Sequence, residues 1–343
     1  MSDQLIDAIE AKLSGNIDDD FKFILSEAFH LKKLGMTHLI KDVFLLFEKQ
    51  YGEEGKKYLF AKAKETQQLR KAEYEKIFKL EKEGKFLEAQ EIAVKLIDTL
   101  PEFPKKNENS VIKTFRSIIE EAYYREYIDK EHVVLRFNEP ISAYYYHIAL
   151  CLARMNDFEG SIEQLDNALR YDDIASEIYT LKAHDYFNLK DVTKFEYNIK
   201  RALEYAYTKE SFHNIYMHIF RYYFELKKKK ECYAFYLAAK FFLKLSPKEN
   251  ETIANAIDIL DGELFLENDL QKVIATIEEC GYTFGFSKSM NNVLRKLLNS
   301  EKAKKELPFR IEILSIIFDV TKDPKIYRQI ELLKNKMEKE TQN

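Results

Sequence analysis

Apolar positions recur at helical spacing along residues 142–175, and the same pattern returns 34 residues later along 176–209. In each segment two amphipathic stretches flank a short polar turn, Asp157-Phe158-Glu159-Gly160 in the first and Lys190-Asp191 in the second. The equivalent apolar positions are Tyr145 and Tyr179, Ala149 and Ala183, Leu165 and Ile199, and Ala168 and Ala202. A repeat of this length predicts stacked helical hairpins, because a single hairpin cannot bury its apolar face alone.

A third hairpin follows at an offset of 37 residues, and a degenerate one precedes the clear pair. In the third hairpin, Tyr216, Phe220 and Tyr223 take the positions of Tyr179, Ala183 and Tyr186, and its second helix carries Cys232, Tyr236 and Ala239. We expect the three extra residues to lie in the turn at 207–210, where an insertion costs little. The degenerate hairpin is predicted over 70–101, with its turn at Gly84-Lys85.

The remaining segments predict further helices and one interruption. Three amphipathic helices are predicted at about 2–14, 18–34 and 37–51, followed by a charged helical stretch over 53–83. Residues 101–110, with two prolines and a polar cluster, predict a loop or hinge. A helix over 110–127 and an extended connector at 133–137 come next. Helices near 249–266, 268–279, 287–299, 301–320 and 324–338 complete the chain.

The two clear segments resemble the tetratricopeptide repeat (TPR) family, with tyrosine at Tyr145 and Tyr179 where that family often has tryptophan. The chain departs from the family pattern at Lys182, where a leucine-like residue is usual, and at Asp173, where proline is usual. Residues 112–327 also resemble a group of uncharacterised bacterial TPR proteins, through 202–207 and 318–323. The resemblance implies an all-α fold, a right-handed superhelix of antiparallel helix pairs (a TPR-like α-solenoid) with an N-terminal helical block. The expected domains are the block at 1–105, the superhelix at 106–333 and a frayed tail at 334–343.

Composition and charge narrow the expected partners. The 343 residues carry a net charge of −4, and 46% are hydrophobic. Residues 139–208 hold 12 acidic and 7 basic side chains, the opposite of a phosphate-binding surface. The first 50 residues carry six lysines, no arginine and nine acids, and the helix expected at 37–51 is mostly apolar, which argues against a DNA-reading helix. We therefore expect no nucleic acid partner.

The chain also lacks the signals of secretion, membrane insertion and catalysis. There is no basic segment followed by an apolar run at the N-terminus, no long apolar segment, and only three widely spaced cysteines. Nucleotide-binding glycine motifs, zinc-ligand spacings and a glycine-flanked nucleophile are all absent from the sequence. We expect a cytoplasmic protein that is not an enzyme, has no cofactor and no metal, and makes no contact with membranes.

The resemblance also implies where a partner binds. In TPR proteins the first helix of each hairpin lines a concave groove, with residues one, two and five positions after the large aromatic side chain. Transferred to this chain, that rule and the next turn of each helix predict the groove residues Tyr146, His147, Leu150, Arg154, Thr180, Leu181, His184, Asn188, Met217, His218 and Arg221. The clamp that grips a peptide carboxylate in TPR co-chaperones is not recognisable, since Tyr146 and Leu150 stand at two of its positions.

Two readings of this groove remain open at this point. A protein or peptide partner docks in it, or the chain's own C-terminal helices fill it. The expected function is a non-catalytic TPR scaffold or adaptor that binds a protein or peptide in its concave groove. The alternative is a peptide-sensing cytoplasmic regulator that acts through protein–protein contact, similar to TPR receptors but without a DNA-binding helix.

Overall fold

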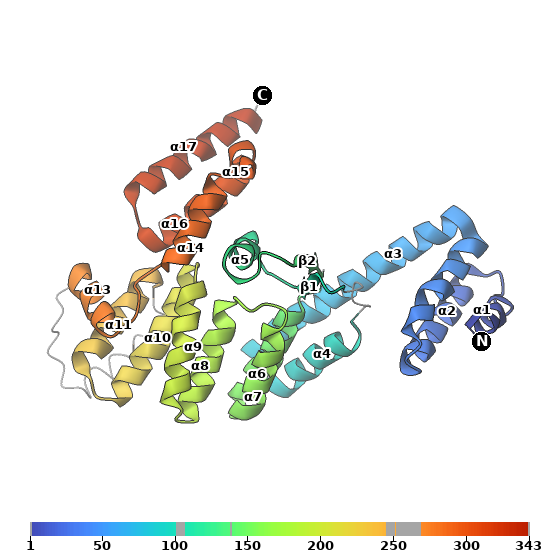
Figure 1. Ribbon diagram of the computed structural model, residues 1–343, viewed down its shortest axis with the longest axis horizontal. Helices are drawn as coiled ribbons and strands as arrows, with labels where there is room; N and C mark the ends of the chain where they lie inside the picture. The colour runs from blue at the N-terminus through green and yellow to red at the C-terminus, as the bar shows by residue number, and fades with distance from the viewer. Residues whose placement is uncertain (1, 101–106, 138, 245–250, 252–268, 342–343) are drawn as a thin grey trace. The chain divides into compact units, whose positions relative to one another are not determined.

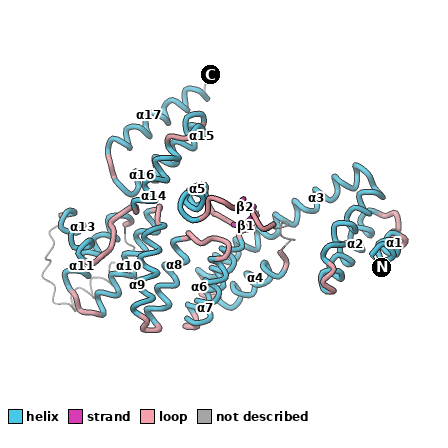
Figure 2. Tube along the Cα trace, in the orientation of Figure 1, coloured by secondary structure: helices cyan, strands magenta, loops and turns pink. Residues whose placement is uncertain are grey.

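The computed structural model describes residues 2–100, 107–137, 139–244, 251 and 269–341. Helices make up most of these residues, and the strands among them form a single two-stranded sheet (Figure 2). The predicted all-α class is therefore confirmed. The chain divides into two compact units, Met1–Lys76 and Ile77–Asn343. This division lies earlier than the predicted boundary at 105, since α4 (Phe86–Asp98) packs against α6 (Ile141–Arg154) of the second unit.

The first unit contains α1 (Ser2–Glu10), α2 (Ile17–Lys33), the short 3-10 helix η1 (Thr37–Leu39) and the first part of α3 (Ile40–Lys82). Gly52 interrupts α3 with a left-handed φ of 57°, which separates the predicted helices at 37–51 and 53–83. The unit's core is apolar and lies between these helices; its buried members are Ile9, Ile24, Leu31, Leu39, Val43, Leu46 and Phe47.

Consecutive helix pairs form the main part of the second unit (Figure 1). The pairs are α6 with α7 (Phe158–Leu169), α8 (Ser176–Asn188) with α9 (Val192–Tyr205), and α10 (Lys209–Glu225) with α11 (Lys229–Phe242). The end of α3 and α4 flank the turn of the predicted degenerate hairpin. Alanines 149, 168, 183 and 202 are fully buried, as expected where helices approach closely.

All four hairpin turns are built in the same way. Each contains one residue in the left-handed conformation: Gly84, Asn156, Lys190 or Lys227, with φ of 75°, 66°, 63° and 56°. The amide of the following residue donates to a carbonyl five positions back, at 2.9–3.0 Å. This is the Schellman ending of a helix. The same ending occurs at each of these four turns. The backbone therefore repeats here even where the residue type at the left-handed position differs.

The three extra residues of the third hairpin lie in a helix, contrary to our expectation. The connection between α9 and α10 is only 206–208, whereas that between α7 and α8 is 170–175. Helix α10 begins earlier and has 17 residues, against 13 in α8. Thr208 caps its start by accepting a hydrogen bond from the Ser211 amide. The insertion therefore lengthens the first helix of the hairpin and leaves the turn short.

A small insert precedes the clear hairpins, and here the predicted helix at 110–127 is wrong in its first part. Residues Ser110–Lys113 form strand β1, which pairs in parallel with β2 (Val133–Arg136). Between them lie α5 (Ile118–Tyr123) and the π-helical turn η2 (Tyr124–Ile128). Strand β2 coincides with the predicted extended connector. We call residues 110–136 the insert. Residues 101–106 of the predicted hinge lie outside the described residues.

The C-terminal helices are α13 (Leu270–Glu279), α14 (Lys288–Leu298), α15 (Glu301–Lys305), α16 (Leu307–Thr321) and α17 (Pro324–Thr341). The helix expected at 301–320 is two helices, with Pro308 in the first turn of the second. Helix α17 continues to Thr341, through most of the segment expected to be frayed. The predicted helix near 249–266 lies almost entirely outside the described residues.

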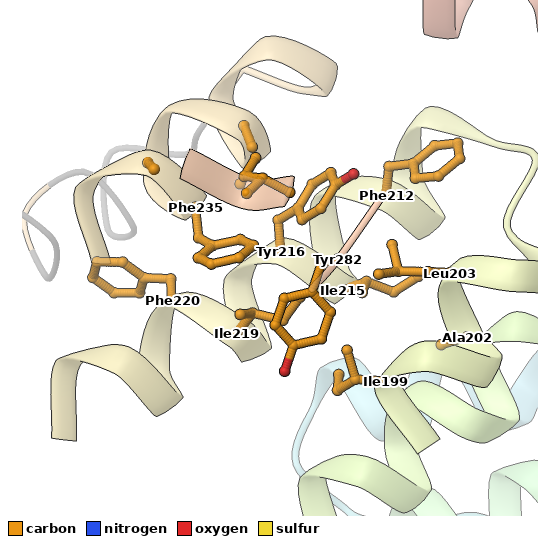
Figure 3. Close-up of a cluster of buried hydrophobic side chains, with 14 of the residues drawn as sticks. Ile199, Ala202, Leu203, Phe212, Ile215, Tyr216, Ile219, Phe220, Phe235 and Tyr282 are labelled. Atoms are coloured by element: carbon orange, nitrogen blue, oxygen red, sulfur yellow. The ribbon is translucent and has the colours of Figure 1, made fainter. Parts of the chain in front are cut away.

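Two apolar cores hold these helices to the hairpins. The larger one joins α9, α10 and α11 to α13 and Tyr282, with Tyr216 and Phe235 at its centre (Figure 3). The Tyr216 hydroxyl donates to the Thr283 carbonyl at 2.8 Å and accepts from the Gly285 amide at 3.1 Å. The second, the insert–C-terminal core, joins the insert to α14–α16 through residues such as Ile119, Tyr123 and Leu294.

Candidate functional site

A pocket of about 850 Å³ opens along the first helices of the three hairpins, α6, α8 and α10. All but two of the predicted groove residues line it. Those that do are Tyr146, Leu150, Arg154, Thr180, Leu181, His184, Met217, His218 and Arg221. We call this space the groove pocket. The first helix of each of three successive hairpins supplies part of the wall. The pocket therefore forms because the hairpins repeat.

His147 lies outside the groove pocket. Its imidazole is only 4% exposed, and its Nδ1 lies 2.7 Å from the Glu81 Oε1 atom. The ring packs edge-on against Phe78, with ring centroids 4.6 Å apart. Both partners belong to the end of α3, so His147 joins α6 to the preceding hairpin and does not face a ligand.

Asn188 is the second predicted residue that does not line the pocket. Its side-chain amide donates to the His184 carbonyl at 2.8 Å. Its Oδ1 atom accepts a bond from the Arg221 guanidinium at 3.4 Å. Arg221 also lies over the Phe187 ring, 5.0 Å from its centroid. Asn188 and Phe187 therefore position Arg221 from behind the pocket wall.

A buried carboxylate orients the pocket imidazole of His184. Asp185 is fully buried, and its Oδ1 atom lies 3.0 Å from His184 Nδ1. Its Oδ2 atom accepts a 2.6 Å hydrogen bond from the Ser161 hydroxyl. Burial raises the pKa of Asp185, while its bonds to His184 and Ser161 oppose that rise. The other ring nitrogen of His184, Nε2, lies 3.2 Å from the Asn188 side-chain amide, so both ring nitrogens have partners within the protein.

His218 is a second imidazole in the pocket, packed edge-on against His184 with ring centroids 5.5 Å apart. Desolvation, with smaller contributions from the neighbouring His184, Arg221 and Arg154, lowers its pKa to about 3. His218 is therefore neutral at physiological pH. It offers the pocket one donor and one acceptor without adding charge.

The insert contributes a lining residue that sequence reasoning missed. Arg116 precedes α5 and pairs with Glu120 and Glu177, and its Nε atom lies 3.6 Å from the Asp172 carboxylate. Burial and the nearby Glu120 carboxylate raise the pKa of Asp172 well above its usual value, and Arg116 opposes this. Arg116 lies outside the repeats, next to the paired strand β1, so the repeat spacing in the sequence does not predict it as a pocket residue.

Other lining residues lie on the helices of the hairpins, at positions that the family rule does not specify, and one of them, Glu210, was expected in a turn. They are Ala153, Glu177, Glu210, Ser211, Asn214, Phe220, Phe224 and Glu225. Helical spacing carries the missing signal, since Phe220 and Phe224 follow Met217 by three and seven residues and so share its face. The lengthened α10 also adds pocket-lining residues near its start, at 210, 211 and 214.

The C-terminal helices pack away from this pocket. No residue of 269–341 lines it, within the part of the chain that the structure describes. Helices α14–α16 instead cover the insert and residues such as Tyr205, at the end of α9, through the insert–C-terminal core. Among the described helices, those at the C-terminus leave the groove pocket open.

The described residues place no metal cluster here or elsewhere: nowhere do three or more histidine, cysteine or acidic side chains converge in a way that could hold an ion. None of the helices in the described ranges combines the length and apolar composition that crossing a membrane requires. The groove pocket offers polar groups, apolar contacts and charges of both signs, from Arg116, Arg154 and Arg221 and from Glu177, Glu210 and Glu225. In comparisons with known proteins, no family model matches the chain and no curated protein matches its sequence.

Proposed function

We propose that this chain is a non-catalytic scaffold that binds a protein or peptide segment in the groove pocket. In this proposal the hairpins form a right-handed, TPR-like superhelix in a cytoplasmic protein, and the pocket lies on its concave face. Binding would depend on shape and on a few anchoring contacts, as is usual for grooves that receive an extended or helical segment.

The observation that carries the proposal is the composition of the groove pocket. Tyr146, Leu150 and Met217, from two different helices, are only partly buried and face the same space. A volume of about 850 Å³ lies in the range of sites that enclose most of a small ligand or several side chains of a peptide. His184, held by Asp185 and Asn188, places a fixed polar ring beside these apolar surfaces.

The test is selection of random dodecapeptides displayed on phage against the full chain. Selected peptides are then synthesised with a fluorescent label, and their affinities are measured by anisotropy. We expect the double variant Tyr146→Ala/Met217→Ala to weaken binding by about tenfold or more, because both side chains offer apolar area to a bound segment.

The matched control is Tyr197→Ala on α9, whose tyrosine is 57% exposed and does not line the groove pocket. This variant should bind the selected peptides as the wild type does. Peptides that bind the pocket variant and the wild type equally well would place recognition elsewhere on the molecule. Failure to select any peptide that binds below about 1 mM would also contradict the proposal.

A further inference from the structure

Two arginines of the groove pocket have no acidic partner in the described part of the chain. No carboxylate of the described residues lies within ion-pairing distance of the Arg154 or Arg221 guanidinium. Both side chains are exposed and line the pocket. Within the described ranges, the contacts of Arg221 are with neutral groups, the Asn188 amide oxygen and the Phe187 ring.

The two guanidinium groups act on the same part of the pocket. Both line the groove pocket together with His218, and both contribute to lowering the pKa of that imidazole. His218 and the apolar side chain of Met217 lie beside each other on α10 and both line the space. Two guanidinium groups without an acidic partner among the described residues therefore share the pocket with an apolar surface.

The acidic side chains of the pocket are mostly engaged already. Glu177 pairs with Arg116, and Glu225 lies 3.4 Å from the Lys190 ammonium. Glu210 is the remaining lining carboxylate, near the start of α10. Arg154 stands at the opposite end of its own helix, as the last residue of α6. The charges of Arg154 and Arg221 are therefore not neutralised by the pocket itself.

We propose that the groove pocket selects peptide segments in which an acidic side chain stands next to an aliphatic or aromatic one. The ligand's carboxylate binds between Arg154 and Arg221, and its apolar neighbour packs on Tyr146, Leu150 and Met217. Arginine favours this role because its planar donor array matches a carboxylate. This inference rests on the proposed function and adds the chemical class of the segment that binds.

The charges that line the groove pocket favour an acidic peptide over a nucleic acid as its ligand. A polynucleotide brings a phosphate with every nucleotide, and its affinity depends on many basic contacts. Among the described residues, the lining arginines without an acidic partner are Arg154 and Arg221, which are too few basic contacts to follow a continuous run of phosphates. A peptide with an isolated acidic side chain needs only this pair.

The test repeats the phage selection with wild-type protein and with Arg154→Gln/Arg221→Gln, both as full chains. The wild type should enrich peptides rich in Asp and Glu beside Leu, Phe or Tyr, and the double variant should not. For a synthesised binder, replacing its Glu or Asp by Gln or Asn should weaken wild-type binding by about tenfold and leave the variant's binding unchanged.

The matched control is Arg295→Gln/Arg328→Gln, which removes the same charge from exposed positions on α14 and α17 and should retain the acidic preference. Enrichment of peptides without acidic residues, still dependent on Tyr146 and Met217, would overturn the charge preference while supporting the groove as a binding site. Selected peptides that depend on none of these pocket residues would overturn both proposals. If a labelled oligo-dU bound the wild type more tightly than the selected peptides do, and the Arg154→Gln/Arg221→Gln variant lost that binding, the ligand would be a nucleic acid and the peptide proposal would be wrong.

Discussion

The 2.7 Å contact between His147 and Glu81 joins helix α6 to the hairpin before it. The Glu81 side chain is only 12% exposed, and the imidazole is its nearer partner, with the Cys151 Sγ atom 4.0 Å from the same oxygen. Phe78 completes the contact by packing against the ring edge. A single histidine thus satisfies a half-buried carboxylate and fills space between two hairpins.

His147→Ala should therefore lower the free energy of unfolding by about 1–3 kcal/mol, because the half-buried carboxylate loses its partner. Chemical denaturation checks this. Replacing both members, as His147→Phe/Glu81→Leu, should recover much of the loss, since no unpaired polar group remains. Binding of selected peptides by His147→Ala should match the wild type. If His147→Ala lost peptide binding but kept its stability, His147 would be a groove residue after all.

A second residue-scale prediction concerns His218, whose pKa in the folded protein is about 3 against an ordinary value of 6.5. Between these values the unfolded chain binds a proton that the folded chain does not. The folding free energy that depends on neutral His218 is therefore complete above about pH 6.5 and is lost progressively as the pH falls toward 3.

NMR measures this directly through the Cε1–H resonance of His218. Its chemical shift should remain constant from about pH 8 to about pH 5, while a blocked histidine added to the sample titrates normally. In His218→Gln, the fall in stability below about pH 6.5 should become shallower. A His218 resonance that titrates together with the added reference would show that its ring is well solvated.

The candidate site was predictable from the sequence to the extent that helical spacing fixes which side chains share a face. His218 and His147 stand at the same place in their repeats, yet one lines the groove pocket and the other is covered by Glu81 and Phe78. Whether a helix face is covered depends on the neighbouring hairpin. The helical period of the sequence gives no information about that neighbour. Arg116 was missed for a similar reason, because strand pairing brings it to the pocket.

At the scale of elements, the shared turn of the four hairpins has a conformational cost that differs from one hairpin to the next. The left-handed residue is glycine in the hairpin at Gly84, but lysine at Lys190 and Lys227. A side chain with a Cβ atom is strained in this conformation, whereas glycine is not. No ion pair or ring contact of Lys227 is among those that the structure describes, and Lys190 lies over the Phe187 ring.

Lys227→Gly should therefore stabilise the protein by about 0.5–1 kcal/mol, because removing the Cβ atom relieves strain in the turn. The control is Lys200→Gly, an exposed lysine inside α9. There glycine should destabilise by about 1 kcal/mol through lost helix propensity. Denaturant midpoints of both variants give the comparison, and destabilisation of equal size at the two positions would contradict the role of the turn.

The elements themselves were predictable where local pattern and tertiary packing agree. The three hairpins follow directly from apolar periodicity. The insert does not, because Ser110–Lys113 needs a partner strand at Val133–Arg136 before it is extended. The β-branched Val111 and Ile112 were the local signal for a strand, but the helical pattern that begins at Ile118 hides so short a segment. Pro308 was the signal for the break between α15 and α16.

At the scale of the whole molecule, the division between Lys76 and Ile77 predicts two units that are stable separately. Among the described residues, those that line the groove pocket run from 116 to 225, all within the second unit. A fragment of residues 71–343 should therefore fold cooperatively and bind selected peptides with wild-type affinity. Circular dichroism and anisotropy check the two parts of this prediction. An unfolded or aggregated fragment would show that the first 70 residues stabilise the rest.

The insert–C-terminal core has a consequence for the order of events during synthesis. Ile119 and Leu294 are neighbours in this core but lie roughly 175 residues apart in the chain. At about 5–20 residues per second, the ribosome takes on the order of 10–35 seconds to make the intervening segment. Hairpins can close as they emerge, and Tyr205 of α9 can then pack against Tyr123. The apolar surface of α5 that packs against α14 stays uncovered until α14 is made. A nascent chain paused in that interval exposes an apolar surface that chaperones recognise. The chain is therefore most prone to aggregate before the synthesis of α14 is complete.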